Sequence, residues 1–154
     1  MRRKVIAGNW KMNKLPNEAI KFLEELTPLV KDSENEVVVC VPFIDLFYSL
    51  LIAQNTNIKI GAQNMHWEES GAYTGEVSAE MLKSIGVEYV IIGHSERREY
   101  FAETDETVNK KIKKAHKVGL KPIVCVGETL EQREEGKAVE VITTQTRLAL
   151  DGLT

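Results

Sequence analysis

Two patterns of apolar residues alternate along the chain. Short continuous runs rich in β-branched residues are typical of strands buried on both faces of a sheet, and longer segments with apolar residues every three or four positions are typical of amphipathic helices. The predicted strands cover residues 4–7, 36–41, 57–61, 89–92 and 122–126. The predicted helices cover residues 17–30, 46–54, 78–85, 105–119 and 138–150, and a further helix opens at residue 94.

This alternation predicts an α/β fold in which right-handed βαβ units build a parallel sheet. No linker, low-complexity tract or charge block interrupts the 154 residues, a length that suits one domain. Two architectures satisfy the pattern. An open, doubly wound sheet is complete at this length, whereas an eight-stranded βα barrel needs about 250 residues. Periodicity alone favours the open sheet.

Polar residues mark where several helices begin. Ser78 and Asp105 are predicted N-caps, because their side-chain oxygens can accept hydrogen bonds from the first helical turn. Thr129 and Gln132 have the spacing of a capping box. In the helix over residues 105–119 the apolar face comprises Val108, Ile112 and Ala115, and the lysines lie on another face.

Composition and charge exclude several classes of function. The chain is 43% hydrophobic, with 20 basic and 23 acidic residues and a formal net charge of −3. This balance indicates a folded core and argues against nucleic acid or an anionic membrane as the partner. The apolar segment near the N-terminus is too short for a signal sequence or a membrane span, so we expect a soluble, cytoplasmic protein.

Neither cysteine has the setting of a reactive or metal-binding residue. Cys40 and Cys125 each lie inside an apolar run, where a thiol behaves as a small buried hydrophobe. No pair of cysteines or histidines has ligand-like spacing, so no metal site is predicted. Two such cysteines fit a reducing compartment.

Candidate chemistry lies at the carboxyl ends of the predicted strands, where both architectures place their functional sites. The polar residues there are Asn9, Lys11, Gln63, Asn64, His94, Glu96 and Glu128. None belongs to a Gly-x-Gly-x-x-Gly motif, a P-loop or an acidic pair that would hold magnesium. A lysine, a histidine and a carboxylate suit a small, oxygen-rich anion instead.

His94 is the central candidate among them. It lies where a strand turns into a helix, beside unpaired N–H groups and the positive end of the helix dipole, and both oppose a second proton on the imidazole. A neutral imidazole can polarise a carbonyl, and Lys11 can neutralise developing negative charge. From the residues alone, structural roles for these side chains are the simpler interpretation. His66 and His116 we assign to a loop surface and a helix surface.

Five segments of the chain resemble triosephosphate isomerase. They are GNWKMN (8–13), GAQN (61–64), GAYTGEVS (71–78), IIGHSERR (91–98) and VCVGETLEQRE (124–134), and they occur in the family's order and at its spacings. Five concordant segments are far more specific than any single motif. The resemblance implies a TIM-barrel fragment, in which residues 1–154 form one partial domain with about five of the eight βα units of a (β/α)₈ barrel.

The resemblance also implies roles for individual residues. Asn9 and Lys11 match the substrate-binding pair, and Lys11 is the cation that stabilises the substrate phosphate and the enediolate. His94 matches the electrophilic histidine, whose neutral state is an established feature of this family, and Glu96 matches a supporting carboxylate next to it. The implied reaction interconverts dihydroxyacetone phosphate and D-glyceraldehyde 3-phosphate by a 1,2-proton transfer and requires no metal or organic cofactor.

A homodimer is implied as well. The loop over residues 62–75, around Thr74, resembles the loop that inserts into the neighbouring subunit in the family. Glu76 and Arg97 are expected to be partners across that interface. Cys125 matches a buried structural cysteine.

The resemblance also predicts what this polypeptide lacks. The family's catalytic glutamate follows the sixth strand, and the closing lid and the phosphate-binding turns lie further along. We expect the 154-residue polypeptide alone to be a very poor or inactive isomerase, because a general base contributes about 10²–10⁴ in rate. Its unclosed sheet edges should then need a partner, such as a complementing C-terminal fragment.

Two other functions fit the same residues. The chain could be a non-catalytic assembly module whose exposed edges associate with copies of itself. It could also be a sugar-phosphate binding module that kept Lys11 and lost the chemistry.

Overall fold

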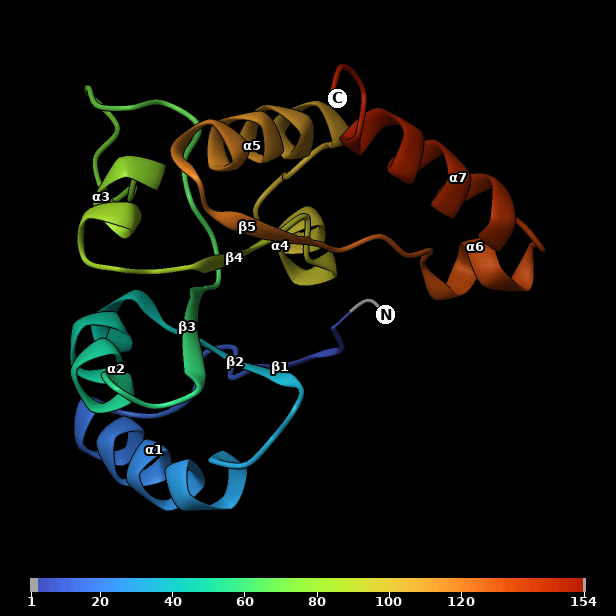
Figure 1. Ribbon diagram of the computed structural model, residues 1–154. Helices are drawn as coiled ribbons and strands as arrows, with labels where there is room; N and C mark the ends of the chain where they lie inside the picture. Colours follow the sequence, from blue (N-terminus) through green and yellow to red (C-terminus); the bar gives the residue numbers. More distant parts are fainter. Residues whose placement is uncertain (1–2, 154) are drawn as a thin grey trace.

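The computed structural model describes residues 3–153, which build one curled sheet of five parallel strands (Figure 1). The strands are β1 (Val5–Asn9), β2 (Glu36–Val41), β3 (Ile58–Ala62), β4 (Tyr89–Ile92) and β5 (Lys121–Val124). Each strand pairs with the next one along the chain. All five predicted strands are confirmed, with ends shifted by about two residues at most.

The strand order decides between the two predicted architectures. A doubly wound sheet changes direction at a switch point, whereas a barrel adds each strand beside the preceding one. Here the order is sequential, and the sheet curls enough that Lys121 Nζ at the start of β5 lies 3.1 Å from Glu36 Oε1 at the start of β2. The open sheet that periodicity favoured was therefore wrong, and the partial barrel is confirmed.

Helices follow the strands and cover the outer face of the sheet (Figure 1). They are α1 (Pro16–Val30), the 3₁₀ turn η1 (Phe43–Asp45), α2 (Leu46–Ala53), α3 (Ala79–Ser84), α4 (Ser95–Tyr100), α5 (Asp105–Val118), α6 (Leu130–Glu134) and α7 (Ala138–Ala149). Between β4 and β5 the chain forms two helices, the short α4 and the longer α5. His94 therefore lies at the start of α4, and α5 follows as a second helix that supports α4.

The core has an outer and an inner layer, because successive side chains of a strand point to opposite faces. On β2, Val39 and Val41 point outward and join the cluster between the sheet and the helices, which includes Leu23 of α1 and Ile112 of α5. The inner cluster on the concave face comprises Val38, Cys40, Tyr89 and Ile91. Burial on both faces explains why the strand sequences are continuous apolar runs.

Gly61 of β3 makes room for the inner layer. A Cβ atom at this position would lie 2.7 Å from Cys40 Sγ and 3.2 Å from Tyr89 Cβ, both of which are side-chain atoms of neighbouring strands. Desolvation in this layer raises the pKa of the Cys40 thiol to about 12, and burial also raises the pKa of the partly buried Cys125. Both cysteines are free. Cys40 is a buried hydrophobe, as predicted, whereas Cys125 is only partly buried.

The helix caps follow the sequence prediction with one correction. Ser78 Oγ accepts a hydrogen bond from the Met81 N–H at 3.2 Å, and Thr129 and Gln132 form the predicted capping box. The N-cap of α5, however, is Thr104 and not Asp105. Asp105 is the first helical residue, and its carboxylate binds Arg98 at 2.6 Å, which the sequence spacing did not indicate.

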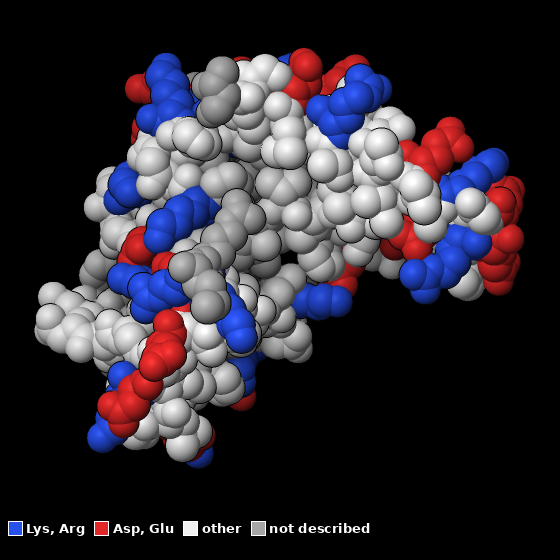
Figure 2. Space-filling view, turned by 45° about the vertical axis from the view of Figure 1, so that its right-hand side comes forward, with Lys and Arg blue, Asp and Glu red and all other residues white. Residues whose placement is uncertain are grey.

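Charged residues of both signs lie around the margins of the face in Figure 2, and the middle of that face is largely uncharged. Within residues 3–153 the strands β1 and β5 each have one neighbouring strand, and Ile6 of β1 is 60% exposed. In the same part of the chain no helix combines the length and apolar character needed to cross a membrane.

Candidate active site

The carboxyl ends of β1, β3 and β4 meet at one edge of the sheet and border a pocket of about 330 Å³. Its polar lining includes Asn9, Lys11, Gln63, Asn64, His94 and Glu96. These are the strand-end residues that the sequence singled out, and parallel pairing brings them together although they are up to 87 positions apart, from residue 9 to residue 96. Glu128 is the exception, because it pairs with Arg133 at 2.8 Å and does not line this pocket.

Lys11 occupies a strained backbone conformation at the mouth of the pocket. Its φ of 55° lies in the left-handed region, which costs a residue with a side chain about 1–3 kcal/mol. Two contacts hold it there: its N–H donates to Asn9 Oδ1 at 2.9 Å, and its Nζ donates to Glu96 Oε1 at 2.8 Å. Asn9 therefore orients the lysine backbone while Glu96 orients the ammonium group.

His94 is the N-cap of α4, and its ring nitrogen Nδ1 accepts a hydrogen bond from the Glu96 N–H at 3.2 Å. A nitrogen that accepts such a bond carries no proton, so in neutral histidine the proton resides on Nε2. The helix N-terminus thus selects the tautomer that leaves Nε2–H free to donate. This contact leaves Nε2 as the ring nitrogen that can donate a hydrogen bond to a ligand.

Glu96 lies between the other two groups. Its hydrogen bond from Lys11 holds the pKa of its carboxyl group below the ordinary value, and its Oε2 lies 3.5 Å from His94 Nδ1. An ionised carboxylate that is already engaged with a lysine is a weak base. In this arrangement Glu96 positions Lys11 and is poorly suited to abstract a proton from carbon.

The helix α4 is held by polar contacts rather than by packing, because none of its side chains is buried. Arg98 Nε donates to the Gly93 carbonyl at 2.8 Å and its Nη1 binds Asp105. Arg97 Nε lies 3.5 Å from Glu103 Oε2. These contacts attach the helix that carries His94 to the start of α5.

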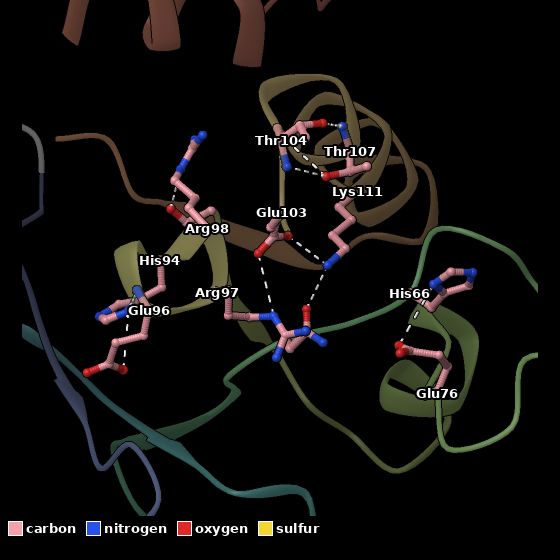
Figure 3. Close-up of polar contacts among 12 residues, drawn as sticks. His66, Glu76, His94, Glu96, Arg97, Arg98, Glu103, Thr104, Thr107 and Lys111 are labelled. Carbon is pink, nitrogen blue, oxygen red and sulfur yellow. Dashed lines mark hydrogen bonds and ion pairs between the residues drawn. The ribbon is translucent and has the colours of Figure 1, made fainter. Parts of the chain in front are cut away.

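A buried polar cluster behind the pocket was missed by the sequence analysis (Figure 3). Lys111 of α5 donates to Asn64 Oδ1 at 2.8 Å and to Glu103 Oε1 at 2.6 Å, and all three residues are buried. The lysines of α5 were assigned to a face away from the apolar one, which is wrong for Lys111. Its positions relative to Val108 (three residues) and Ala115 (four residues) place it on the apolar face, and this spacing could have identified it.

Of the three residues expected at a dimer interface, Glu76 and Arg97 lie in separate contacts within this chain. Thr74 and Glu76 belong to the connection between β3 and α3, in which every residue from 68 to 76 is exposed. Glu76 Oε2 lies 3.8 Å from His66 Nδ1, while Arg97 faces Glu103. Among the described residues Glu76 and Arg97 form no ion pair with each other.

Two further predictions concern histidines. His116 is exposed on α5, as predicted. His66 was assigned to the loop surface, which is wrong: only 12% of its side chain is exposed, because its ring lies 4.2 Å from the Trp67 ring and 4.6 Å from the Tyr73 ring, centroid to centroid.

The sequence of this chain is similar to one family of known proteins. Residues 4–154 match the family model described as triosephosphate isomerase. The chain is 65% identical over 153 residues to the triosephosphate isomerase of Caldanaerobacter subterraneus, covering 99% of this chain and 62% of that relative. It is 61% identical over 154 residues to the enzyme of Acetivibrio thermocellus, covering 99% of this chain and 61% of that relative.

A solved structure gives the same result. The crystal structure of triosephosphate isomerase from Bartonella henselae superposes with a TM-score of 0.93 at 42% identity, covering 99% of this chain and 64% of that one. The chain thus spans less than two thirds of the length of these proteins. Since the family model and the relatives cover almost every residue, this chain belongs to the triosephosphate isomerase family.

Proposed function

We propose that this chain supplies the cationic and electrophilic half of a triosephosphate isomerase active site. The proposed reaction interconverts dihydroxyacetone phosphate and D-glyceraldehyde 3-phosphate by a 1,2-proton transfer. The observation that carries the proposal is the Lys11–Glu96–His94 cluster at the carboxyl edge of the sheet, with Nδ1 of His94 held as an acceptor.

Each group has a defined task in this reaction. Nε2–H of His94 donates to the substrate carbonyl oxygen, and Lys11 attracts the negative charge that develops as the enediolate forms. The polarisation by a neutral histidine is the established chemistry of the family. Asn9 and Glu96 keep Lys11 in place, so that little reorganisation is needed when the charge appears.

The proton transfer also needs a base, and the described residues offer a poor one. Glu96 is the carboxylate of the pocket lining, and Lys11 keeps it ionised and engaged. We therefore propose that the base comes from the part of the family's length that this chain does not span. The 154-residue polypeptide tested by itself should then lose at least about 10²–10⁴ of the rate.

The decisive experiment uses a full-length chimera, in which residues 1–154 precede the part of the Caldanaerobacter relative that this chain does not cover. The chimera should catalyse the isomerisation, and His94→Gln should lower its kcat by about 10²–10⁴. Lys11→Met should be similarly damaging. Lys113→Met is the matched control, because this exposed lysine forms no ion pair among the described residues. A folded chimera without activity would contradict the proposed function.

We propose a second copy of the chain as the partner, with the loop around Thr74 inserting near the pocket of the neighbour. Met12 at the pocket mouth is 96% exposed and Phe101, which also lines the pocket, is 64% exposed, an unusual state for side chains beside a functional site. Covering them with a partner's loop would bury apolar surface and let Glu76 meet Arg97 across the interface.

The two free cysteines support the cytoplasm, a reducing compartment, as the location.

The exposed edge strand β1 favours one alternative, a non-catalytic module that associates with copies of itself. Ile6 and Val5 offer apolar surface and unpaired backbone groups at this edge. Light scattering of the 154-residue polypeptide across a concentration series distinguishes the two ideas. Open-ended growth supports edge association, whereas a discrete dimer supports the interface around Thr74.

A further inference from the structure

The connection between β3 and α3 projects from the molecule without a core of its own. Residues 68 to 76 are all exposed, and the two ends of the segment meet where the His66 N–H donates to the Val77 carbonyl at 2.8 Å. Figure 1 shows this green segment running beside α5 before it returns to α3. Such a loop must be held from outside if it is to keep one shape.

Three lysines of α5 contact successive points of this connection. Lys111 binds Asn64, where the segment leaves β3. Lys110 Nζ lies 5.5 Å from the centre of the Trp67 ring. Lys114 Nζ lies 3.7 Å from Glu69 Oε2 and also pairs with Glu80 on α3.

Lys114 is well placed to act as a fixed anchor. Only 11% of its side chain is exposed, and the hydrogen bond to Glu80 raises the pKa of its ammonium group, so the charge is present at every physiological pH. Glu69 is the exposed partner, with 73% of its side chain accessible to solvent. The ion pair therefore ties an exposed loop residue to a largely covered lysine of α5.

A row of neighbouring rings links Lys110 to Tyr73 through Trp67 and His66. Lys110 lies on the Trp67 ring, Trp67 stacks on His66, and His66 stacks on Tyr73, the residue before Thr74. Figure 3 shows His66, the middle ring of the three, lying above Glu76, whose Oε2 is 3.8 Å from His66 Nδ1. Fixing Trp67 thus fixes the side chains that flank the proposed docking residue.

We infer that Lys110 and Lys114 are positioning residues that hold the Trp67–Glu76 loop in the shape in which it docks onto a second copy of the chain. This inference rests on the proposed dimer. Its physical basis is that a loop ordered before binding loses less conformational entropy on binding and so binds more tightly.

The test compares Lys110→Met with Lys114→Met and the double variant, which remove the charge but keep the aliphatic stem. Glu69→Gln removes only the loop side of the ion pair and leaves the Lys114–Glu80 contact intact. Lys113→Met, on an exposed face of the same helix, is the control. Amide hydrogen exchange of residues 67–76 and the dimer dissociation constant from sedimentation equilibrium are measured for each protein.

We expect the double variant to exchange these amides about tenfold faster and to raise the dissociation constant about tenfold, while Lys113→Met changes neither. Glu69→Gln should give a smaller change of the same sign. Unchanged exchange in the double variant would overturn the inference. If the parent protein forms no dimer, the proposed assembly fails, and the exchange rates still decide whether the two lysines hold the loop.

Discussion

Removing the ammonium group of Lys111 tests whether the Lys111–Glu103 ion pair behind the pocket is shielded from solvent, as its burial indicates. Lys111 and Glu103 form an ion pair at 2.6 Å with side chains 6% and 2% exposed, and Lys111 also holds Asn64. Lys111→Met keeps most of the side-chain volume. It leaves Glu103 as a buried carboxylate with only the longer Arg97 contact, at 3.5 Å.

The magnitude follows from that burial. Removing one partner of a buried pair costs about 3–5 kcal/mol, because the remaining charge is neither hydrated nor compensated. A native domain is stable by about 5–15 kcal/mol, so the variant should lose a large share of its stability. For a chain of this length such a change lowers the midpoint of thermal unfolding by roughly 6–20 °C.

Urea unfolding followed by circular dichroism measures the free energy of unfolding for four proteins: the parent, Lys111→Met, a double variant and a control. The double variant Lys111→Met with Glu103→Gln should recover roughly half of the loss, since no unpaired charge stays buried. The control Lys113→Met should stay within about 0.5 kcal/mol of the parent. A cost below about 1 kcal/mol for Lys111→Met, or no recovery in the double variant, would refute the reasoning.

Three further predictions follow from the site and the inner layer. The Glu96 carboxyl group should titrate at a pKa below that of an unperturbed glutamate, and carbon NMR should show that Lys11→Met raises this pKa. Because the pKa of Glu96 is lowered in the folded state, the contribution of the Lys11–Glu96 pair to stability is present above about pH 4 and disappears as the pH falls through that pKa. Gly61→Ala should destabilise the fold by about 1–3 kcal/mol in a urea titration, because the new Cβ atom would lie too close to Cys40 Sγ. Adding Cys40→Ala should restore part of that loss. Gly8→Ala should cost less in the same titration, because the space around Gly8 is open. The Cys40 thiol, whose pKa is raised to about 12, should react with a thiol reagent at pH 8 only at the rate of unfolding, and fast reaction in native buffer would contradict its burial.

Much of the local structure could be predicted from short-range patterns. Continuous β-branched runs identified the five strands, because strands covered on both faces tolerate few polar residues. The cap at Ser78 and the box at Thr129 depend on contacts within one helical turn, and both were predicted. The strand-end positions of Lys11, His94 and Glu96 were likewise visible in the linear sequence.

What the linear pattern could not supply was the partner of each side chain across the fold. The cap prediction failed at Asp105 because Arg98, seven residues earlier, takes its carboxylate. His66 is covered by Trp67 and Tyr73, whose approach depends on how the loop folds back. For Lys111 the spacing does indicate the apolar face, but only the fold shows that Asn64 and Glu103 meet its ammonium group there.

By itself, therefore, the sequence determined where strands and helices lie, which polar residues end the strands and, through its five motifs, the family. The tertiary structure decided the order of the strands, and with it the choice of a curled partial barrel over an open sheet. It also decided that the Glu96 carboxylate holds Lys11, which lies 85 positions away in the chain. The physical reason is the range of the interactions: propensity and capping act within a few residues, whereas strand order and the contact from Lys11 to Glu96 join positions far apart in the chain.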